Sequence, residues 1–192
     1  MKLSKNWRHK VVGFAVLAMV PLWGISECTS ALAAKSPTAG DIVPPTPTKI
    51  TSSKFAVNQD KGYISKISVG TTVYTLWNSL GEKDFVTVFD KSNNVVAGDK
   101  TLGTGMVASI MDEGTVVAKY TVIVTGDTNG DGKINITDMI AIKACTLKKS
   151  GLSGVYQKAG DVNGDGKINI TDFIKIKATT LKKDTIIGVT VK

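Results

Sequence analysis

The chain has 192 residues, of which 42% are hydrophobic, and a formal net charge of +8 at pH 7. This length suits one domain or two small ones, and the composition excludes both a membrane channel and a largely disordered polypeptide. The Lys residues are spread along the chain without an aromatic-rich strand signature. We therefore interpret them as solvated surface and predict no nucleic-acid partner.

Residues 1–33 have the three-part pattern of a secretory signal peptide. Basic residues gather in positions 1–10, an apolar run follows at 11–25, and Ala31-Leu32-Ala33 offers a small-x-small cleavage site. The apolar run is short for a membrane span, and the alternative is a retained N-terminal anchor. We expect a secreted protein whose mature chain has no membrane span, with 20 Lys and Arg against 15 Asp and Glu.

A Pro-rich linker is predicted at residues 34–48, because four prolines lie there among Thr, Ser and Gly and none follows Pro47. Cleavage removes the only His and also Cys28, which leaves Cys145 as the single cysteine of the mature chain. An internal disulfide is therefore excluded. We interpret Cys145 as a mildly buried thiol, with intermolecular pairing as the alternative.

The next segment, residues 49–125, predicts a small α+β module made of a sheet and one packed helix. The expected strands span residues 54–57, 63–69, 85–89, 106–111 and 115–124. The expected helix is capped by Thr71 or Thr72 and ends at Gly81. Its core face carries Val73, Leu76, Trp77 and Leu80.

This module shows no catalytic pattern. The mature chain has no His and no Cys placed as a nucleophile, so it lacks the usual general base or acyl-transfer constellation. Trp77 with Tyr63, Tyr74 and Tyr120 offers a sugar-stacking platform, but Trp77 falls at core spacing and is better explained by packing. We predict a non-enzymatic module, with a carbohydrate-binding or enzyme-associated subunit that contacts polysaccharide as the alternative.

The C-terminal part contains an internal repeat. Residues 127–149 and 161–183 agree at 19 of 23 positions, with an offset of 34 residues. Each copy begins with oxygen-bearing side chains at alternate positions, which is the spacing of a calcium-binding loop. We therefore predict two Ca²⁺ ions, one in each loop.

The ligands follow from the loop positions. Positions 1, 3, 5, 9 and 12 supply side chains, position 7 supplies a backbone carbonyl, and position 6 is Gly because the chain turns sharply there. Position 12 is Asp, which is shorter than the Glu of the usual calcium sensor, so the following helix must come closer to the ion. The predicted ligands are Asp127, Asn129, Asp131, Lys133, Asn135 and Asp138 in the first loop and Asp161, Asn163, Asp165, Lys167, Asn169 and Asp172 in the second.

A helix with an apolar stripe for its partner is predicted after each loop. The stripes are Ile136, Ile140, Ala144 and Leu147, and Ile170, Ile174, Ala178 and Leu181. Ile134 and Ile168 suit a short strand-like bridge between the loops. A strand precedes the first loop and the Gly-containing segment 150–160 precedes the second, so we interpret both units as loop–helix without an entering helix.

Two loops of the form D-x-N-x-D-G-x-I-N-x-x-D, each followed by one helix, make residues 126–183 resemble a type I-like dockerin. The resemblance implies that residues 126–192 are an all-α dockerin with two F-hand calcium loop–helix units. It also implies docking onto a cohesin module of a scaffold protein, in cellulosomes or related polysaccharide-degrading or cell-surface complexes. The module at 49–125 is more weakly similar to small accessory modules that precede some dockerins.

The resemblance further implies that cohesin contacts come from loop positions 10 and 11 and from the following helix. These residues are Ile136, Thr137, Lys143, Ala144, Leu147 and Lys148 in the first copy and Ile170, Thr171, Lys177, Ala178, Leu181 and Lys182 in the second. Ile-Thr stands at positions 10 and 11, where many type I members carry Ser-Thr. Because the contact residues are identical in both copies, we expect two binding orientations related by a pseudo-two-fold axis.

The sequence therefore predicts a secreted, non-catalytic adaptor. A calcium-stabilised surface protein without a cohesin partner is a further alternative. The tail at 184–192 suits either a strand or a strip that packs back on the module, and the sequence does not decide between them.

Overall fold

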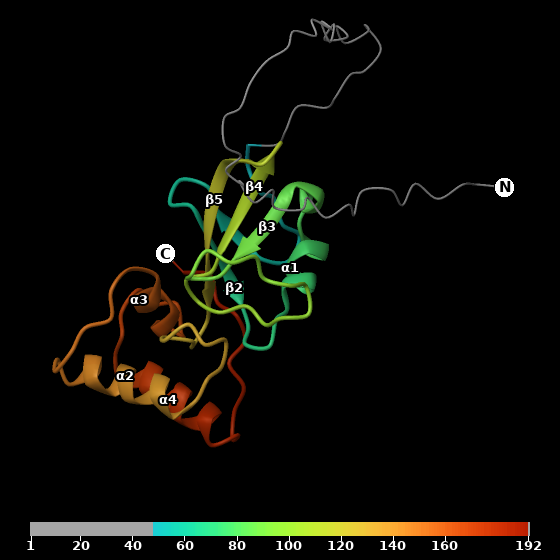
Figure 1. Cartoon of the computed structure of the whole chain (residues 1–192). Coiled ribbons are helices and arrows are strands. Elements are labelled where there is room, and N and C mark those ends of the chain that lie inside the picture. Colours follow the sequence, from blue (N-terminus) through green and yellow to red (C-terminus); the bar gives the residue numbers. More distant parts are fainter. Residues whose placement is uncertain (1–47, 192) are drawn as a thin grey trace, which may run out of the picture. The chain divides into compact units, whose positions relative to one another are not determined.

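The computed structural model describes residues 48–191 (Figure 1), and all of them fall within one compact unit. The predicted signal peptide and nearly all of the predicted linker lie outside the described residues. Within residues 48–191, no helix combines the length and the apolar character needed to cross a membrane.

A five-stranded sheet with the order β1-β2-β5-β4-β3 forms the first part, here called the sheet module (residues 49–125). The strands are β1 (Ala56–Asn58), β2 (Tyr63–Ile67), β3 (Val86–Phe89), β4 (Val107–Asp112) and β5 (Thr115–Val124). β2 and β5 run parallel and the other neighbours run antiparallel. All five predicted strands are confirmed, with ends shifted by no more than two residues.

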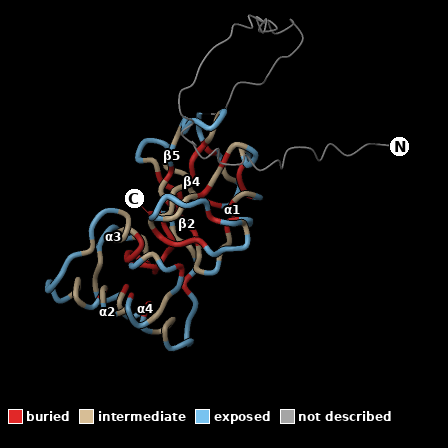
Figure 2. The backbone as a smooth tube through the Cα atoms, in the orientation of Figure 1, coloured by how far each residue is buried: buried red, intermediate tan, exposed pale blue. Residues whose placement is uncertain are grey.

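Helix α1 (Val73–Ser79) packs against this sheet, and a 3-10 turn, η1 (Lys83–Phe85), follows it. Thr72 caps the helix, because its Oγ1 accepts the Thr75 N–H at 3.2 Å. Val73 and Leu76 are buried in the main core and Trp77 packs against it. The predicted helix and its core face are thus confirmed, and Figure 2 shows buried residues both in the strands and in the segments that pack against them.

Three helices form the second part: α2 (Ile136–Thr146), α3 (Gly154–Gly160) and α4 (Ile170–Thr180). α2 and α4 pack on each other, and α3 packs against β5. Helix α3 lies directly before the second loop, so our interpretation that neither loop has an entering helix is wrong for the second copy. Two of the three glycines in 150–160 are the first and last residues of α3, where they weaken the helix least.

The contact between α2 and α4 is not made by the predicted apolar stripes. Ile142 and Ile176 are fully buried in the core of this part, with Met139 and Phe173 packed beside them. The large stripe residues are exposed to similar extents in both copies: Ile136 53%, Ile140 57% and Leu147 54%, against Ile170 55%, Ile174 57% and Leu181 55%. Both helices therefore carry a second apolar face that the described residues leave open.

Ile134 and Ile168 also differ from the prediction. Neither residue is assigned to a strand or bridge, and both are half-buried against the core formed around Ile142 and Ile176. Each isoleucine thus joins its loop to the helices through packing.

The tail returns from α4 to the sheet module, as the red trace in Figure 1 shows. The register of β2 shifts between Ile64 and Ile67, and within this irregularity the Lys66 N–H donates to the Val189 carbonyl at 3.0 Å. The Val189 N–H donates to Thr125 Oγ1 at 3.1 Å, and Val191 is buried. No strand is assigned to residues 184–191, so the tail is the packed strip of our two alternatives.

We predict that Ile176→Ala lowers the free energy of unfolding by about 2–5 kcal/mol, because it empties a fully buried site. Ile174→Ala is the matched control, since the same change at a side chain that is 57% exposed should cost no more than about 0.5 kcal/mol. Denaturant unfolding in saturating calcium measures both values. Equal losses would contradict the assignment of the buried face.

Candidate functional site

The first residue of each predicted calcium loop is an Asp that gathers the backbone of its own loop. Loop 1 is residues 127–138, and loop 2 is residues 161–172. Asp127 accepts the N–H groups of Gly130 at 2.6 Å, Asp131 at 3.1 Å and Gly132 at 3.0 Å. Asp161 accepts the three equivalent groups at 2.8, 3.1 and 2.8 Å. Both loops are therefore curled in the same way around their first carboxylate.

Position 6 shows why this curl needs glycine. Gly132 has φ of 76° and Gly166 has φ of 89°. Both values lie in the left-handed region that other residues enter only at a cost. The predicted requirement for Gly at the sharp turn is thus confirmed in both loops.

The side chains at positions 3, 5 and 9 converge. Asp131 Oδ2 accepts from Nδ2 of Asn129 at 3.1 Å and from Nδ2 of Asn135 at 3.0 Å. Asp165 Oδ2 has the same two partners in loop 2, at 2.9 and 3.1 Å. An Asn amide carries its oxygen and its nitrogen on the same carbon atom. Asn129 and Asn135 reach Asp131 with Nδ2, so a flip of either amide would bring Oδ1 to the same place as an acceptor.

The Asp at position 12 ties each loop to its helix. Asp138 is fully buried, and it accepts the Thr128 N–H at 2.8 Å and the Asn135 N–H at 3.0 Å. Asp172 repeats the arrangement with Val162 at 3.0 Å and Asn169 at 2.9 Å. In both copies this Asp is also the N3 residue of a capping box, which draws the start of α2 or α4 onto the loop.

Burial and a neighbouring carboxylate both disfavour the charged form of one Asp in each loop, Asp127 in loop 1 and Asp172 in loop 2. Burial raises the pKa of Asp127, and the negative charge of Asp138 raises it further, although hydrogen bonds from backbone N–H groups oppose the shift. Burial likewise raises the pKa of Asp172, with the charge of Asp161 adding to the effect. A divalent cation beside such a pair would favour the ionised form of both groups.

The donor set fits Ca²⁺. Within residues 48–191, no three His, Cys, Asp or Glu side chains form a group that could hold a metal ion. Each predicted ligand set contains three Asp, and these three do not meet in one such group here. Two Asn side chains and the backbone carbonyl of Lys133 or Lys167 would supply the other oxygens of each set. Ca²⁺ accepts such mixed oxygen ligands, whereas a cluster of His, Cys and acids would suit a softer metal.

The residues that the resemblance assigns to cohesin binding have matching exposure in both copies. Thr137, Lys143, Leu147 and Lys148 are exposed and Ala144 is half-buried, and their counterparts after loop 2 fall in the same classes. The Thr137 hydroxyl donates to Asn135 Oδ1 at 2.7 Å, as Thr171 does to Asn169. The exposed Ile140 and Ile174 extend the same stripes, although the sequence reasoning did not include them among the contacts.

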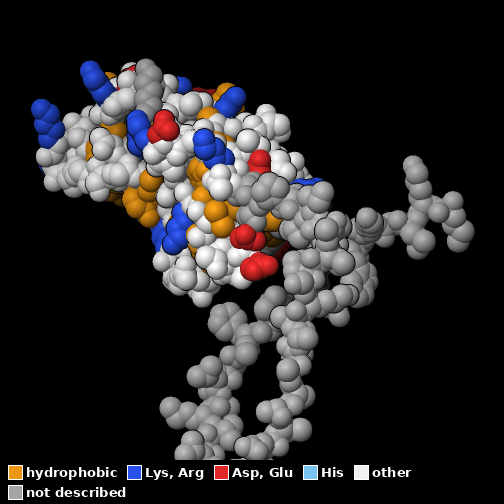
Figure 3. Space-filling view, turned by 90° about the horizontal axis from the view of Figure 1, so that it is seen from above, with side chains coloured by type: hydrophobic (Ala, Val, Ile, Leu, Met, Phe, Trp, Pro, Cys, Tyr) orange, Lys and Arg blue, Asp and Glu red, His pale blue; other side chains and the backbone are white. Residues whose placement is uncertain are grey.

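The aromatic residues of the sheet module do not form one exposed platform. Tyr63 is 3% exposed and Tyr120 is 4% exposed, while Tyr74 is 61% exposed. Trp77 packs against the main core, which confirms its predicted packing role. On the face drawn in Figure 3, the Lys side chains lie at several separate places on the described surface.

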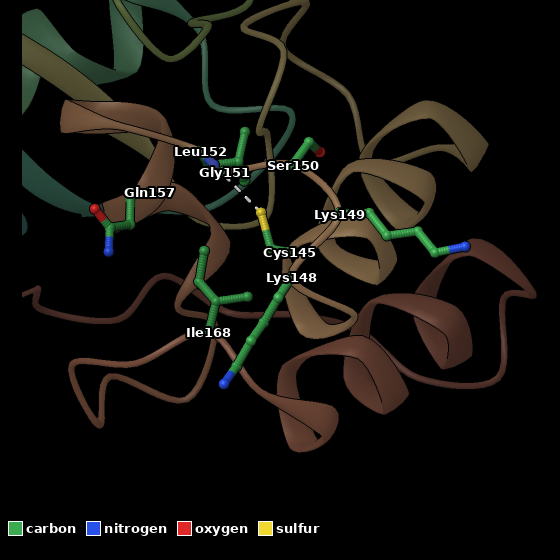
Figure 4. A pocket seen from close by; sticks show the side chains of 8 residues that line it. All are labelled: Cys145, Lys148, Lys149, Ser150, Gly151, Leu152, Gln157 and Ile168. Atoms are coloured by element: carbon green, nitrogen blue, oxygen red, sulfur yellow. Dashed lines mark hydrogen bonds between the residues drawn. The ribbon is translucent and has the colours of Figure 1, made fainter.

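Cys145 is a free, half-buried thiol near the end of α2, as predicted. The Leu152 N–H donates to its Sγ at 3.2 Å, along the dashed line in Figure 4. The thiol lines a hollow of about 420 Å³ together with Gln157 and Ile168. The ammonium groups of Lys148 and Lys149 extend away from the sulfur (Figure 4).

Residues 125–179 match the family model described as Dockerin type I domain. This match spans both loops and most of the helices after them, so the chain carries a type I dockerin domain. Dockerin domains in general bind calcium and dock onto cohesins in cellulosome-type complexes. No curated protein and no solved structure matches the chain.

We predict that calcium removal loosens the dockerin domain, because each loop then holds close carboxylates without a compensating cation. Excess chelator should lower the helical circular dichroism signal, and added calcium should restore it. At free calcium about 100 times Kd, each site should add about 2.7 kcal/mol to stability. A helical signal that is unchanged in excess chelator would contradict this prediction.

Proposed function

We propose that this protein is a secreted, non-catalytic adaptor that uses its dockerin domain to bind a cohesin module of a scaffold protein. The scaffold would belong to a polysaccharide-degrading or cell-surface complex outside the cell. The observation that carries the proposal is the pair of chemically matched, exposed faces on α2 and α4, which folding alone leaves unexplained. The dockerin family match and the secretion pattern at residues 1–33 support the same reading.

Two calcium ions would hold this domain in shape, one in each loop. The ions would neutralise the buried carboxylates, and the chain itself would position the helices through the capping Asp138 and Asp172. On this proposal, α2 and α4 are the helices of two F-hand units. The short α3 is an addition before the second unit that leaves both contact faces open.

The chemistry of each face indicates its partner surface. Ile136, Ile140 and Leu147 offer three large apolar side chains that are already about half buried. Covering the rest of each is therefore worth about half of the ~1.5–3 kcal/mol that full burial gives. Lys143 and Lys148 stand exposed on the same helix or just after it. A complementary cohesin should therefore present an apolar centre with acidic groups at its rim.

The sheet module has a structural role in this proposal. The mature chain has no His, and the aromatic side chains that offered a sugar-stacking platform are mostly used in packing. We therefore assign neither catalysis nor polysaccharide binding to this module.

We predict that the domain binds its cohesin in two orientations, because the contact residues of the two copies are identical. Leu147→Asp alone or Leu181→Asp alone should leave affinity nearly unchanged, since the other orientation remains available. The double variant should abolish binding. Thr137 is a poorer choice for this test, because its hydroxyl is bonded to loop 1 and its loss could disturb calcium binding.

Isothermal titration of each variant with a panel of cohesins in calcium measures this effect. Thr185→Asp is the control, since it adds the same charge at an exposed residue outside both faces. Loss of binding in one single variant would contradict the two orientations. Absence of binding to every cohesin by the unmodified chain would contradict the proposed function itself.

A further inference from the structure

The two calcium loops agree at every predicted ligand position, yet their surroundings differ. Loop 1 lies against residues 101–105 of the sheet module. The Thr104 N–H donates to Asp127 Oδ2 at 2.9 Å, and Thr104 is fully buried. The carboxylate of Asp127 therefore accepts a fourth backbone N–H group, whereas the contacts found within residues 48–191 give Asp161 only the three of its own loop.

The glycines of the loops show the same difference in packing. A Cβ atom added to Gly132 would lie 2.8 Å from the Leu102 carbonyl oxygen, and one added to Gly130 would overlap the Thr104 carbonyl oxygen. At the equivalent Gly164 the nearest atom would be 3.4 Å away, and at Gly166 nothing lies within 4 Å. The backbone of loop 1 is thus in close contact with the sheet module, while loop 2 is largely open.

Lys91 adds a third contact. Its Nζ donates to the Asn129 carbonyl at 2.6 Å and lies 5.1 Å from the centre of the Tyr156 ring. This side chain joins the sheet module to both loop 1 and α3. Its positive charge would oppose a nearby cation, whereas the contacts at Thr104, Gly130 and Gly132 are made by uncharged backbone groups.

We propose that the sheet module completes loop 1 and makes it the tighter of the two calcium sites, filled before loop 2. This inference rests on the proposed calcium-dependent function. The rigidity of a loop is one of the features that set its calcium affinity, and a loop already held in its bound shape loses less entropy on binding. By linkage, calcium in loop 1 should stabilise residues 101–105 in return.

The first test measures each site separately in the full chain. Asn163→Ala with Asp165→Ala disables loop 2, and Asn129→Ala with Asp131→Ala disables loop 1 while leaving the Thr104–Asp127 contact in place. Titration with calcium chloride should give the lower Kd for the chain that retains loop 1. Equal Kd values, or a lower Kd for loop 2, would overturn the inference.

The second test disturbs the contact from the side of the sheet module. A Cβ at Gly103 would lie 2.7 Å from the Gly130 carbonyl oxygen, so Gly103→Ala should push loop 1 away. We expect about tenfold or more loss of affinity at loop 1, as for other residues that support metal ligands from behind, and no change at loop 2. Gly151→Ala is the control, because nothing lies within 4 Å of its added atom. Equal weakening of both sites would contradict the proposal.

A third measurement needs no variant. Hydrogen–deuterium exchange on the unmodified chain should slow at residues 101–105 when calcium is added, because the Thr104 N–H is held by a loop 1 ligand. Unchanged exchange there, with calcium bound, would overturn the inference even if Gly103→Ala failed to fold. Failure of both loops to bind calcium would instead contradict the proposed function.

Discussion

The structure of the dockerin domain depends on pairs of buried carboxylates. Each loop opens and closes with an Asp, and Asp127, Asp138, Asp161 and Asp172 are at most 5% exposed. Backbone N–H groups satisfy their oxygens but cannot cancel two neighbouring negative charges. Because the closing Asp also caps α2 or α4, the same carboxylates that call for a cation place the helix that carries the contact face. On the proposed function, metal binding and presentation of that face would therefore be coupled.

Short sequence patterns were sufficient to predict an element where the pattern is compatible with only one kind of secondary structure. Strand β5 (Thr115–Val124) is β-branched almost throughout, so it could be predicted from the sequence. The helix cap could be predicted to within one residue, as Thr71 or Thr72, and the structure assigns it to Thr72. Helix α3 was missed because its glycines suggested a loop, although two of them stand only at its ends. The tail lacked a deciding signal, since its hydrogen bonds to Lys66 and Thr125 depend on partners far away in the chain.

Periodicity could not show which side of α2 and α4 is buried, because both helices have apolar residues on more than one side. Ile142 and Ile140 are only two positions apart, yet one is fully buried and the other is 57% exposed. Packing between α2 and α4 needs only the buried residues, such as Ile142 and Ile176. The exposed apolar residues are repeated in both copies with similar exposure. Exposed apolar residues arranged in this way are typical of a surface that another protein covers.

The contact between loop 1 and the sheet module was beyond sequence reasoning for a different reason. It joins Thr104 and Asp127 across 23 residues through a backbone N–H group that almost any residue could provide. The two loops are identical at every predicted ligand position, but affinity also depends on what holds a loop in shape. The side chains on α2 and α4 keep the symmetry of the repeat, whereas the backbone around the loops does not. Two orientations of binding and two unequal calcium sites are therefore compatible, because the first depends on side chains at the surface and the second on the neighbours of the loop.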